Sequence, residues 1–233
     1  MLRRWRYRSC PKWSLLIVRS SRQAQRPITN LARHKVVRFE DVALVLLAAG
    51  RSSRFGGGKL LTELGGMPLA FHAARTFAAL PFATRVAVYS DDTPDLGSFG
   101  FECVKLSPAD APLSRSIAQG VAIAMRDDPA AIMIALADMP FVSAAHLSDM
   151  VAQFDGDRLA TWGVATMPPA LFGPQHFGAL SALSGDRGAG ALLHDAATIA
   201  LDPALAIDID SKDDLERARQ SVERKWNGGR GRD

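Results

Sequence analysis

The sequence contains few of the residues that disulfide-stabilised and metal-centred proteins require. Only two cysteines, Cys10 and Cys103, occur in 233 residues, too few for a disulfide scaffold or a four-cysteine zinc site. The five histidines show no metal-binding spacing, and no Ser/His/Asp or Cys/His set stands out. No run of about 18 apolar residues is present, which excludes a membrane-spanning helix. We therefore expect a globular, cytoplasmic protein with no membrane partner.

Acidic residues are missing from the first 39 positions. Residues 1–39 hold eleven of the 28 Lys and Arg residues and none of the 24 Asp and Glu residues. The remainder therefore carries 17 basic against 24 acidic residues, so the overall charge of +4 reflects the first segment and not the body. Aromatic residues interleave with the arginines, which would suit a nucleic-acid arm. We favour a disordered extension or a start assigned too far upstream, and expect no nucleic-acid partner.

Apolar runs typical of buried strands alternate with helical patterns from residue 42 onward. This alternation predicts an α/β fold, Rossmann-like and three-layered, with a mostly parallel central sheet. We expect a single domain over residues 40–226 and a loose tail over residues 227–233. The expected strands are 42–47, 85–90, 102–106, 131–136, 158–162, 198–201 and 206–209, and the expected helices are 69–80, 114–125, 144–154 (capped by Ser143), 175–183, 188–197 and 212–225.

A glycine-rich loop follows the first expected strand and reads LAAGRSSRFGGGKLL over residues 47–61. Its small residues let backbone N–H groups approach an anion, and Arg54 and Lys59 add two positive charges, which suits a triphosphate. The Walker loop requires Gly at position 53 and Ser or Thr at position 60, where the chain has Ser53 and Leu60. The dinucleotide fingerprint fails too, because it needs Gly at position 52 or 61, depending on where it starts.

Acidic residues follow two other expected strands. Asp138 lies in the string ALADMPFV after strand 131–136, and Asp208 and Asp210 lie in AIDIDSKDDL after the last strand begins. Ligands bind parallel sheets at the carboxyl ends of the strands, where carboxylates are placed to hold Mg²⁺. Two alternatives remain open from the residues alone. Asp138 could be a turn residue, and Asp210 could cap the final helix.

Two serines, Ser114 and Ser116, stand at the start of helix 114–125 in the string PLSRSIAQG. Their hydroxyl groups could contact a nucleobase or cap the helix. The residues alone favour the capping role by about two to one, because serine is among the preferred residues at helix N-termini.

The loop pattern L-A-A-G-x-S-x-R-F-G-x-x-K-L-L, with L-A-D-M-P around Asp138, resembles the signature of nucleotidyltransferases related to the molybdenum cofactor guanylyl- and cytidylyltransferases. The resemblance covers about residues 42–220. It is closer to the cytidylyltransferases, because guanylyltransferases usually have a second glycine in place of Ala49. The stretch over residues 112–120 is similar to the family's nucleotide-contacting segment, although Pro112 replaces the usual glycine.

The resemblance implies transfer of CMP from CTP to the terminal phosphate of molybdopterin, with release of pyrophosphate and Mg²⁺ as cofactor. A client molybdoenzyme would receive the product. Alternatives are guanylyl transfer, another phosphorylated acceptor such as a sugar or polyol phosphate, and a non-catalytic protein that delivers the cofactor. The same resemblance implies that Arg54 and Lys59 hold the nucleotide phosphates, that Arg54, Lys59 and Asp138 are the catalytic residues, and that Asp138 and Asp210 are the metal ligands. It also implies that the nucleotide is lined by Leu47, Ala48, Ala49, Gly50, Ser114 and Ser116.

Overall fold

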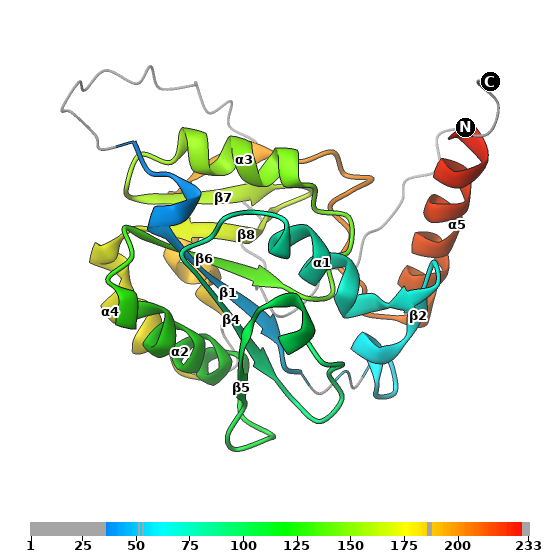
Figure 1. Cartoon of the computed structure of the whole chain (residues 1–233), viewed down its shortest axis with the longest axis horizontal. Helices are drawn as coiled ribbons and strands as arrows, with labels where there is room; N and C mark the ends of the chain where they lie inside the picture. Colours follow the sequence, from blue (N-terminus) through cyan, green and yellow to red (C-terminus); the bar gives the residue numbers. More distant parts are fainter. Residues whose placement is uncertain (1–35, 51, 53, 186–187, 230–233) are drawn as a thin grey trace.

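The computed structural model describes residues 36–229 except 51, 53, 186 and 187, so most of the expected N-terminal extension lies outside the described residues. A seven-stranded sheet runs through the molecule in the order β5-β4-β1-β6-β8-β7-β9 (Figure 1). Neighbouring strands are parallel except β8, which is antiparallel to both β6 and β7. The expected α/β fold with a mostly parallel sheet is therefore confirmed. The strands of this sheet are β1 (Val42–Ala48), β4 (Thr84–Tyr89), β5 (Glu102–Lys105), β6 (Ala131–Leu136), β7 (Arg158–Trp162), β8 (Thr166–Phe172) and β9 (Ala197–Ala200), and a separate hairpin pairs β2 (Glu63–Leu64) with β3 (Met67–Pro68).

The centre of the core is formed by β1 and β6, whose residues are all buried. Their continuous apolar sequences suit this position, because both faces of the sheet are covered there. Helix α1 (Leu69–Ala78) lies on the path from β1 to β4, and α2 (Leu113–Ala124) on the path from β5 to β6. These paths run in opposite directions along the sheet, so right-handed crossovers place the two helices on opposite faces.

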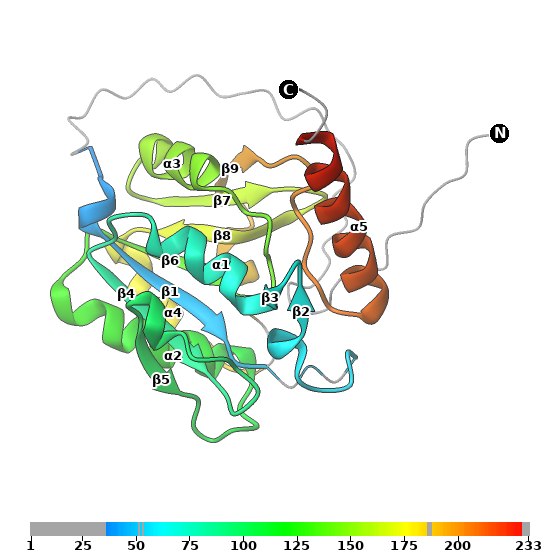
Figure 2. The ribbon, with the colours of Figure 1, turned by 45° about the vertical axis from the view of Figure 1, so that its right-hand side comes forward.

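Three further helices complete the described structure. Helix α3 (Ala144–Gln153) packs on β8, α4 (Phe177–Ser181) lies beside α2, and α5 (Lys212–Gly229) stands next to β2 (Figures 1 and 2). The Ser143 hydroxyl accepts a hydrogen bond from the His146 amide at 3.2 Å, which confirms the expected N-cap of α3. Among the described residues, no helix combines the length and apolar character needed to cross a membrane.

Two segments expected to be regular are not. Residues 206–209, expected as the last strand, pair with no strand and form an irregular connection before α5. Within 188–197, expected as a helix, the chain forms only a 3₁₀ segment, η7 (Ala189–Leu193). In both cases the sequence pattern did not identify the type of local structure, since periodicity is weakly informative for short segments.

Strand β8 was missed because its sequence, TMPPALF, contains adjacent prolines, which cannot donate hydrogen bonds to a sheet. The structure accommodates them at a shift in register. Ala170 pairs with Ala160, whereas Met167 pairs with the next residue, Thr161, so the two intervening prolines have no ladder partner on β7. The bulge removes the need for the missing N–H groups.

The ordered body extends beyond the expected limits at both ends. Val37 is buried in the core, and the ring of Phe39 packs edge-on against Phe82 with centroids 5.0 Å apart. The body therefore includes residues assigned above to the basic extension. At the other end α5 continues to Gly229, three residues into the segment expected to be loose.

Candidate active site at the carboxyl edge of the sheet

Strands β1 and β6 are neighbours and end at the same edge. Leu47 pairs with Leu136, and the amide of Ala137 donates to the carbonyl of Leu47 at 3.1 Å. Asp138 follows directly and is buried. Its carboxylate therefore stands beside the point where the glycine-rich loop leaves β1, as the general placement of ligand sites in parallel sheets predicts.

Three successive glycines shape the end of this loop. Gly56, Gly57 and Gly58 have φ angles of 94°, 95° and 59°, a left-handed region that residues with a Cβ rarely adopt. The chain then enters a short 3₁₀ turn, η3 (Lys59–Leu61), and the side chain of Lys59 is only 5% exposed. The glycines thus allow the turn that brings a lysine into the protein beside the strand ends.

The buried lysine contacts two carboxylates from distant parts of the chain. The Lys59 Nζ donates to Asp138 Oδ2 at 2.6 Å and to Asp210 Oδ1 at 3.1 Å. The guanidinium of Arg54 lies 3.5 Å from the other Asp210 oxygen and is half-exposed. The structure therefore brings together the two cations and the two carboxylates that the sequence singled out.

The surrounding charges keep Lys59 protonated. Burial alone would lower the pKa of the Lys59 ammonium, but the carboxylates of Asp138, Asp208 and Asp210 and the hydrogen bond to Asp138 outweigh it and raise the pKa above the ordinary 10.5. This lysine is consequently a fixed positive charge, suited to binding an anion and not to accepting a proton.

The segment before α5 carries two of the carboxylates. The amide of Ile209 donates to the Asp138 carbonyl at 3.1 Å, which fixes the segment against the end of β6. Ser211, and not Asp210, caps α5: the Ser211 Oγ accepts from the Asp214 amide at 3.2 Å, and Asp214 Oδ2 accepts from the Ser211 amide at 2.8 Å. The alternative of Asp210 as a cap is therefore wrong, and its carboxylate faces the lysine instead.

Three carboxylates can hold a divalent cation here. One oxygen each of Asp138, Asp208 and Asp210 lies within 4.8 Å of the others. Carboxylate oxygens are the ligands that Mg²⁺ and Mn²⁺ prefer, so this donor set fits such an ion. Asp208, which the sequence left as the weaker candidate, also belongs to the cluster.

The two serines at the start of α2 do not cap it. Helix α2 begins at Leu113, its N-cap position is Pro112, and no side chain caps it. Ser114 and Ser116 lie inside the first turns and are buried. The capping interpretation is therefore wrong, and nucleobase contact stays a prediction.

The residues expected to line the nucleotide follow the end of β1. Leu47 and Ala48 are buried at the strand end, Ala49 is half-buried, and Gly50 is exposed. The Thr93 hydroxyl donates to the Ala48 carbonyl at 2.7 Å and so ties the loop after β4 to this position. Thr93 was not singled out from the sequence, although its place shortly after a strand could have indicated it.

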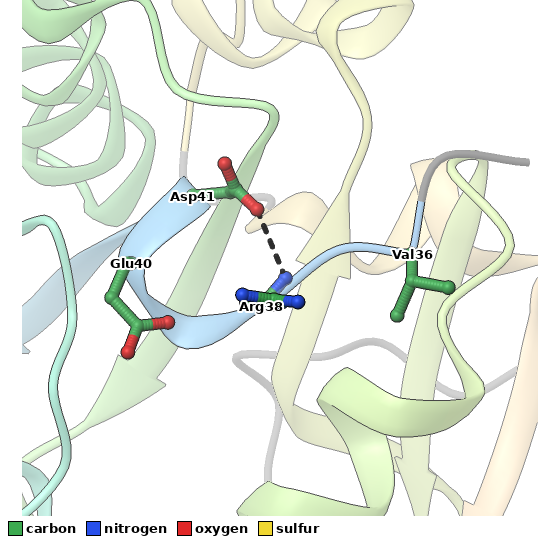
Figure 3. Close-up of a pocket in the computed structure, with 4 residues that line it drawn as sticks. All are labelled: Val36, Arg38, Glu40 and Asp41. Atoms are coloured by element: carbon green, nitrogen blue, oxygen red, sulfur yellow. Dashed lines mark hydrogen bonds between the residues drawn. The ribbon is translucent and has the colours of Figure 1, made fainter.

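A separate hollow of about 640 Å³ lies at the amino end of β1, beside the 3₁₀ turn η2 (Phe39–Asp41). In it Asp41 Oδ2 accepts a hydrogen bond from the Arg38 amide at 3.2 Å (Figure 3). Because η2 precedes β1, this hollow belongs to the edge of the sheet opposite to Lys59. Its lining residues are Val36, Arg38, Glu40 and Asp41.

The fold is similar to those of several solved structures. Rv0371c from Mycobacterium tuberculosis superposes with a TM-score of 0.65 at 22% identity, covering 78% of this chain and 99% of that protein. Molybdopterin-guanine dinucleotide biosynthesis protein A from Archaeoglobus fulgidus gives a TM-score of 0.56 at 18% identity, covering 78% and 99%. In sequence, the bifunctional protein GlmU from Leifsonia xyli is 28% identical over 141 residues, which are 58% of this chain but only 29% of that relative.

A family model gives the assignment. The MobA-like NTP transferase domain matches residues 44–201, about two thirds of the chain, from β1 through the last strand of the sheet. The matched region includes the glycine-rich loop, Lys59 and Asp138. The chain therefore belongs to the MobA-like NTP transferase family.

Proposed function

We propose that the chain transfers CMP from CTP to the terminal phosphate of molybdopterin and releases pyrophosphate. The observation that carries nucleotidyl transfer is the placement of Lys59 between Asp138 and Asp210, directly after the glycine-rich loop. The choice of CTP and of a pterin acceptor rests on the resemblance of residues 47–61 to the molybdenum cofactor cytidylyltransferases. A structural neighbour named for molybdopterin-guanine dinucleotide biosynthesis supports the same acceptor class.

Asp138, Asp208 and Asp210 are the residues that would hold Mg²⁺. Their oxygens are close enough to share one ion, and the structural neighbour Rv0371c has been crystallised with manganese. When bound, Mg²⁺ supplies Lewis-acid polarisation of a phosphate oxygen and neutralises negative charge on the nucleotide. Asp208 extends the pair of ligands expected from the sequence to three.

The reaction requires positioning and charge neutralisation more than proton transfer. An oxygen of the acceptor phosphate forms a bond to the α-phosphorus of CTP, the bond from that phosphorus to the oxygen bridging to the β-phosphate breaks, and pyrophosphate leaves with that oxygen. A phosphate monoester has a second pKa near 6 and is mostly dianionic at neutral pH, so the nucleophile needs no general base.

Lys59 and Arg54 provide the positive charge. Lys59 is buried and its pKa is raised, so it would present a positive charge to the nucleotide phosphates. Arg54 is half-exposed and can follow the departing pyrophosphate. We place both residues on the leaving-group side, and Asp138 on the side of the reacting phosphorus.

The test is release of pyrophosphate by the full chain with Mg²⁺, comparing CTP with GTP, ATP and UTP, with and without molybdopterin. We expect release that needs both CTP and the pterin. Folded Lys59→Ala and Asp138→Ala variants should lose about 100-fold or more in turnover. Lys105→Ala is the matched control, because Lys105 is an exposed lysine paired with Asp91.

Each other outcome contradicts a stated part of the proposal. Release with GTP would keep the reaction and overturn the interpretation of Ala49 as a mark of CTP. Release with CTP and a different phosphorylated acceptor would overturn the assignment of a pterin as the acceptor. CTP binding without release under any condition would point to a delivery protein.

A further inference from the structure

The turn between β7 and β8 exposes two large apolar side chains. Trp162 is 48% exposed and Val164 is 63% exposed, and they are two of only five large hydrophobic residues with high exposure in the described part of the chain. The other three, Val36, Leu61 and Met125, are scattered. Scattered exposed apolar residues are ordinary, but two in one tight turn need a reason.

The same segment that carries the carboxylates holds this turn in place. The amide of Leu201 donates to the Trp162 carbonyl at 2.8 Å. A Cβ on Gly163 would lie 2.7 Å from the Ala206 Cβ, so the turn packs directly on residues that lead into the cluster. The amide of Ile209 then bonds the Asp138 carbonyl. Residues 201–210 therefore run from the turn to the carboxylates of Asp208 and Asp210.

The strand register shows how far Trp162 lies from Asp138. Ala170 of β8 pairs with Ile134 of β6, and β8 is antiparallel. Ala170 also pairs with Ala160 of β7, and Trp162 lies two residues further along β7, because the bulge in β8 adds two residues between Ala170 and Thr166. Trp162 therefore lies at about the level of Leu136, two residues before Asp138. β6 and β7 are separated by β8 alone, or by two strand spacings, which is about 10 Å.

The two substrates are expected to approach Asp138 from different sides. The glycine-rich loop and the start of α2 belong to the side of β1, β4 and β5, where the nucleotide is expected. The turn after β7 lies on the other side, where the second substrate must approach for its phosphate to reach the same cluster. An acceptor whose ring is joined to its phosphate by a short side chain would span about this separation.

We propose that Trp162 determines acceptor specificity by stacking on a planar heteroaromatic ring, with Val164 covering the ring's edge. The inference rests on the proposed function, since it assigns the acceptor of that same site. An indole suits this task, because it offers a large rigid surface that stacks on any flat heterocycle and loses little conformational entropy on binding. A sugar or polyol phosphate presents no such flat surface.

The test is calorimetric titration of the full chain with molybdopterin in the presence of a non-hydrolysable CTP analogue. Trp162→Ala should bind the pterin about tenfold more weakly than wild type, and Trp162→Phe should restore most of the affinity. Met125→Ala is the matched control, because Met125 is an exposed apolar residue on the 3₁₀ segment that follows α2. The affinity for the CTP analogue should be the same in all four proteins, which would exclude misfolding.

Pterin binding that is unchanged in Trp162→Ala, or absent in wild type, would overturn the proposal. Pyrophosphate release by the same proteins distinguishes this failure from failure of the proposed function. Transfer to molybdopterin with equal KM in wild type and Trp162→Ala would leave the function standing and refute stacking. Trp162-dependent pterin binding without any release of pyrophosphate would support stacking and refute the transfer.

Discussion

The ammonium nitrogen of Lys59 lies 2.6 Å from a carboxylate oxygen of Asp138. The lysine of the glycine-rich loop is therefore paired with a carboxylate that we propose as a metal ligand. A Mg²⁺ ion held by the same carboxylate would compete with the ammonium group for its negative charge. Nucleotide phosphates would give Lys59 an alternative partner. Metal and nucleotide should therefore bind cooperatively, each favouring the position of Lys59 that the other requires.

Removing this competition should strengthen metal binding in the absence of nucleotide. The change Lys59→Met nearly keeps the length of the side chain and removes its charge, leaving Arg54 as the cation beside the three carboxylates. We expect Mn²⁺ to bind about tenfold more tightly, whereas the affinity for CTP falls. Electron paramagnetic resonance of free Mn²⁺ measures the first effect and calorimetry the second. Lys105→Met is the control, and metal binding that is unchanged or weaker in Lys59→Met would contradict the prediction.

The sequence predicted the strands best where burial on both faces imposes a continuous apolar run. Strand β6 matches the expected range, and β1 differs by one residue at its end. The prediction was wrong for residues 206–209, because that segment is held in place by one amide bonded to the Asp138 carbonyl and not by a strand pairing. Neither β8 nor this connection has a periodic pattern in its sequence, because contacts with residues distant in the chain position both.

The members of the site were predicted more completely than their mutual contacts. Lys59, Asp138 and Asp210 were identified because each stands next to a predicted strand end or in a recognisable motif. Their direct ion pairs join residues 79 and 151 positions apart, and no local pattern encodes such a pairing. Asp208 remained ambiguous, because residues two apart in a strand face the same way only if the strand exists.

Packing of α2 on the sheet should be sensitive to a single methyl group. A Cβ at Gly120 would lie 2.4 Å from Val45 Cγ1 and 3.1 Å from Val88 Cγ2, both in buried strands. Gly120→Ala should therefore lower the free energy of unfolding by about 1–3 kcal/mol through overpacking. Urea denaturation measures this change.

A second glycine provides the control for this substitution. Gly178 lies in α4, and a Cβ there would meet no atom within 4 Å. Gly178→Ala should leave the stability unchanged or raise it by about 0.5–1 kcal/mol, because alanine loses less backbone entropy in a helix. Equal effects at the two positions would show that α2 adjusts its distance from the sheet.

A buried histidine should make stability depend on pH. His146 Nε2 lies 2.9 Å from the Thr161 hydroxyl, which itself donates to the Pro169 carbonyl at 3.0 Å, so His146 is the donor to Thr161. Burial lowers the pKa of His146 below its ordinary 6.5, although Asp149 opposes this shift. Because the unfolded chain binds the proton more readily, the stability from this residue is complete above about pH 6.5 and decreases as the pH falls towards the folded-state pKa.

Urea denaturation between pH 7.5 and pH 5 should reveal this dependence. His146→Gln keeps a side-chain donor without a titrating ring, so its stability should fall less with acidification than that of wild type. His194→Gln removes an exposed histidine and should retain the wild-type dependence. A variant at position 146 with the full wild-type slope would refute the prediction.

Asp214 should affect turnover although it lies outside the proposed metal site. Its Oδ2 accepts from the amides of Asp210 at 3.3 Å and Ser211 at 2.8 Å, so it both caps α5 and fixes the backbone that carries a proposed metal ligand. Asp214→Ala should lower the free energy of unfolding by about 1 kcal/mol and reduce the rate of pyrophosphate release, with CTP affinity nearly unchanged. Asp213→Ala is the control, because Asp213 is an exposed acid in the same first turn and has the same favourable interaction with the helix dipole. Loss of stability with full turnover in Asp214→Ala would show that the cap stabilises the helix without positioning Asp210.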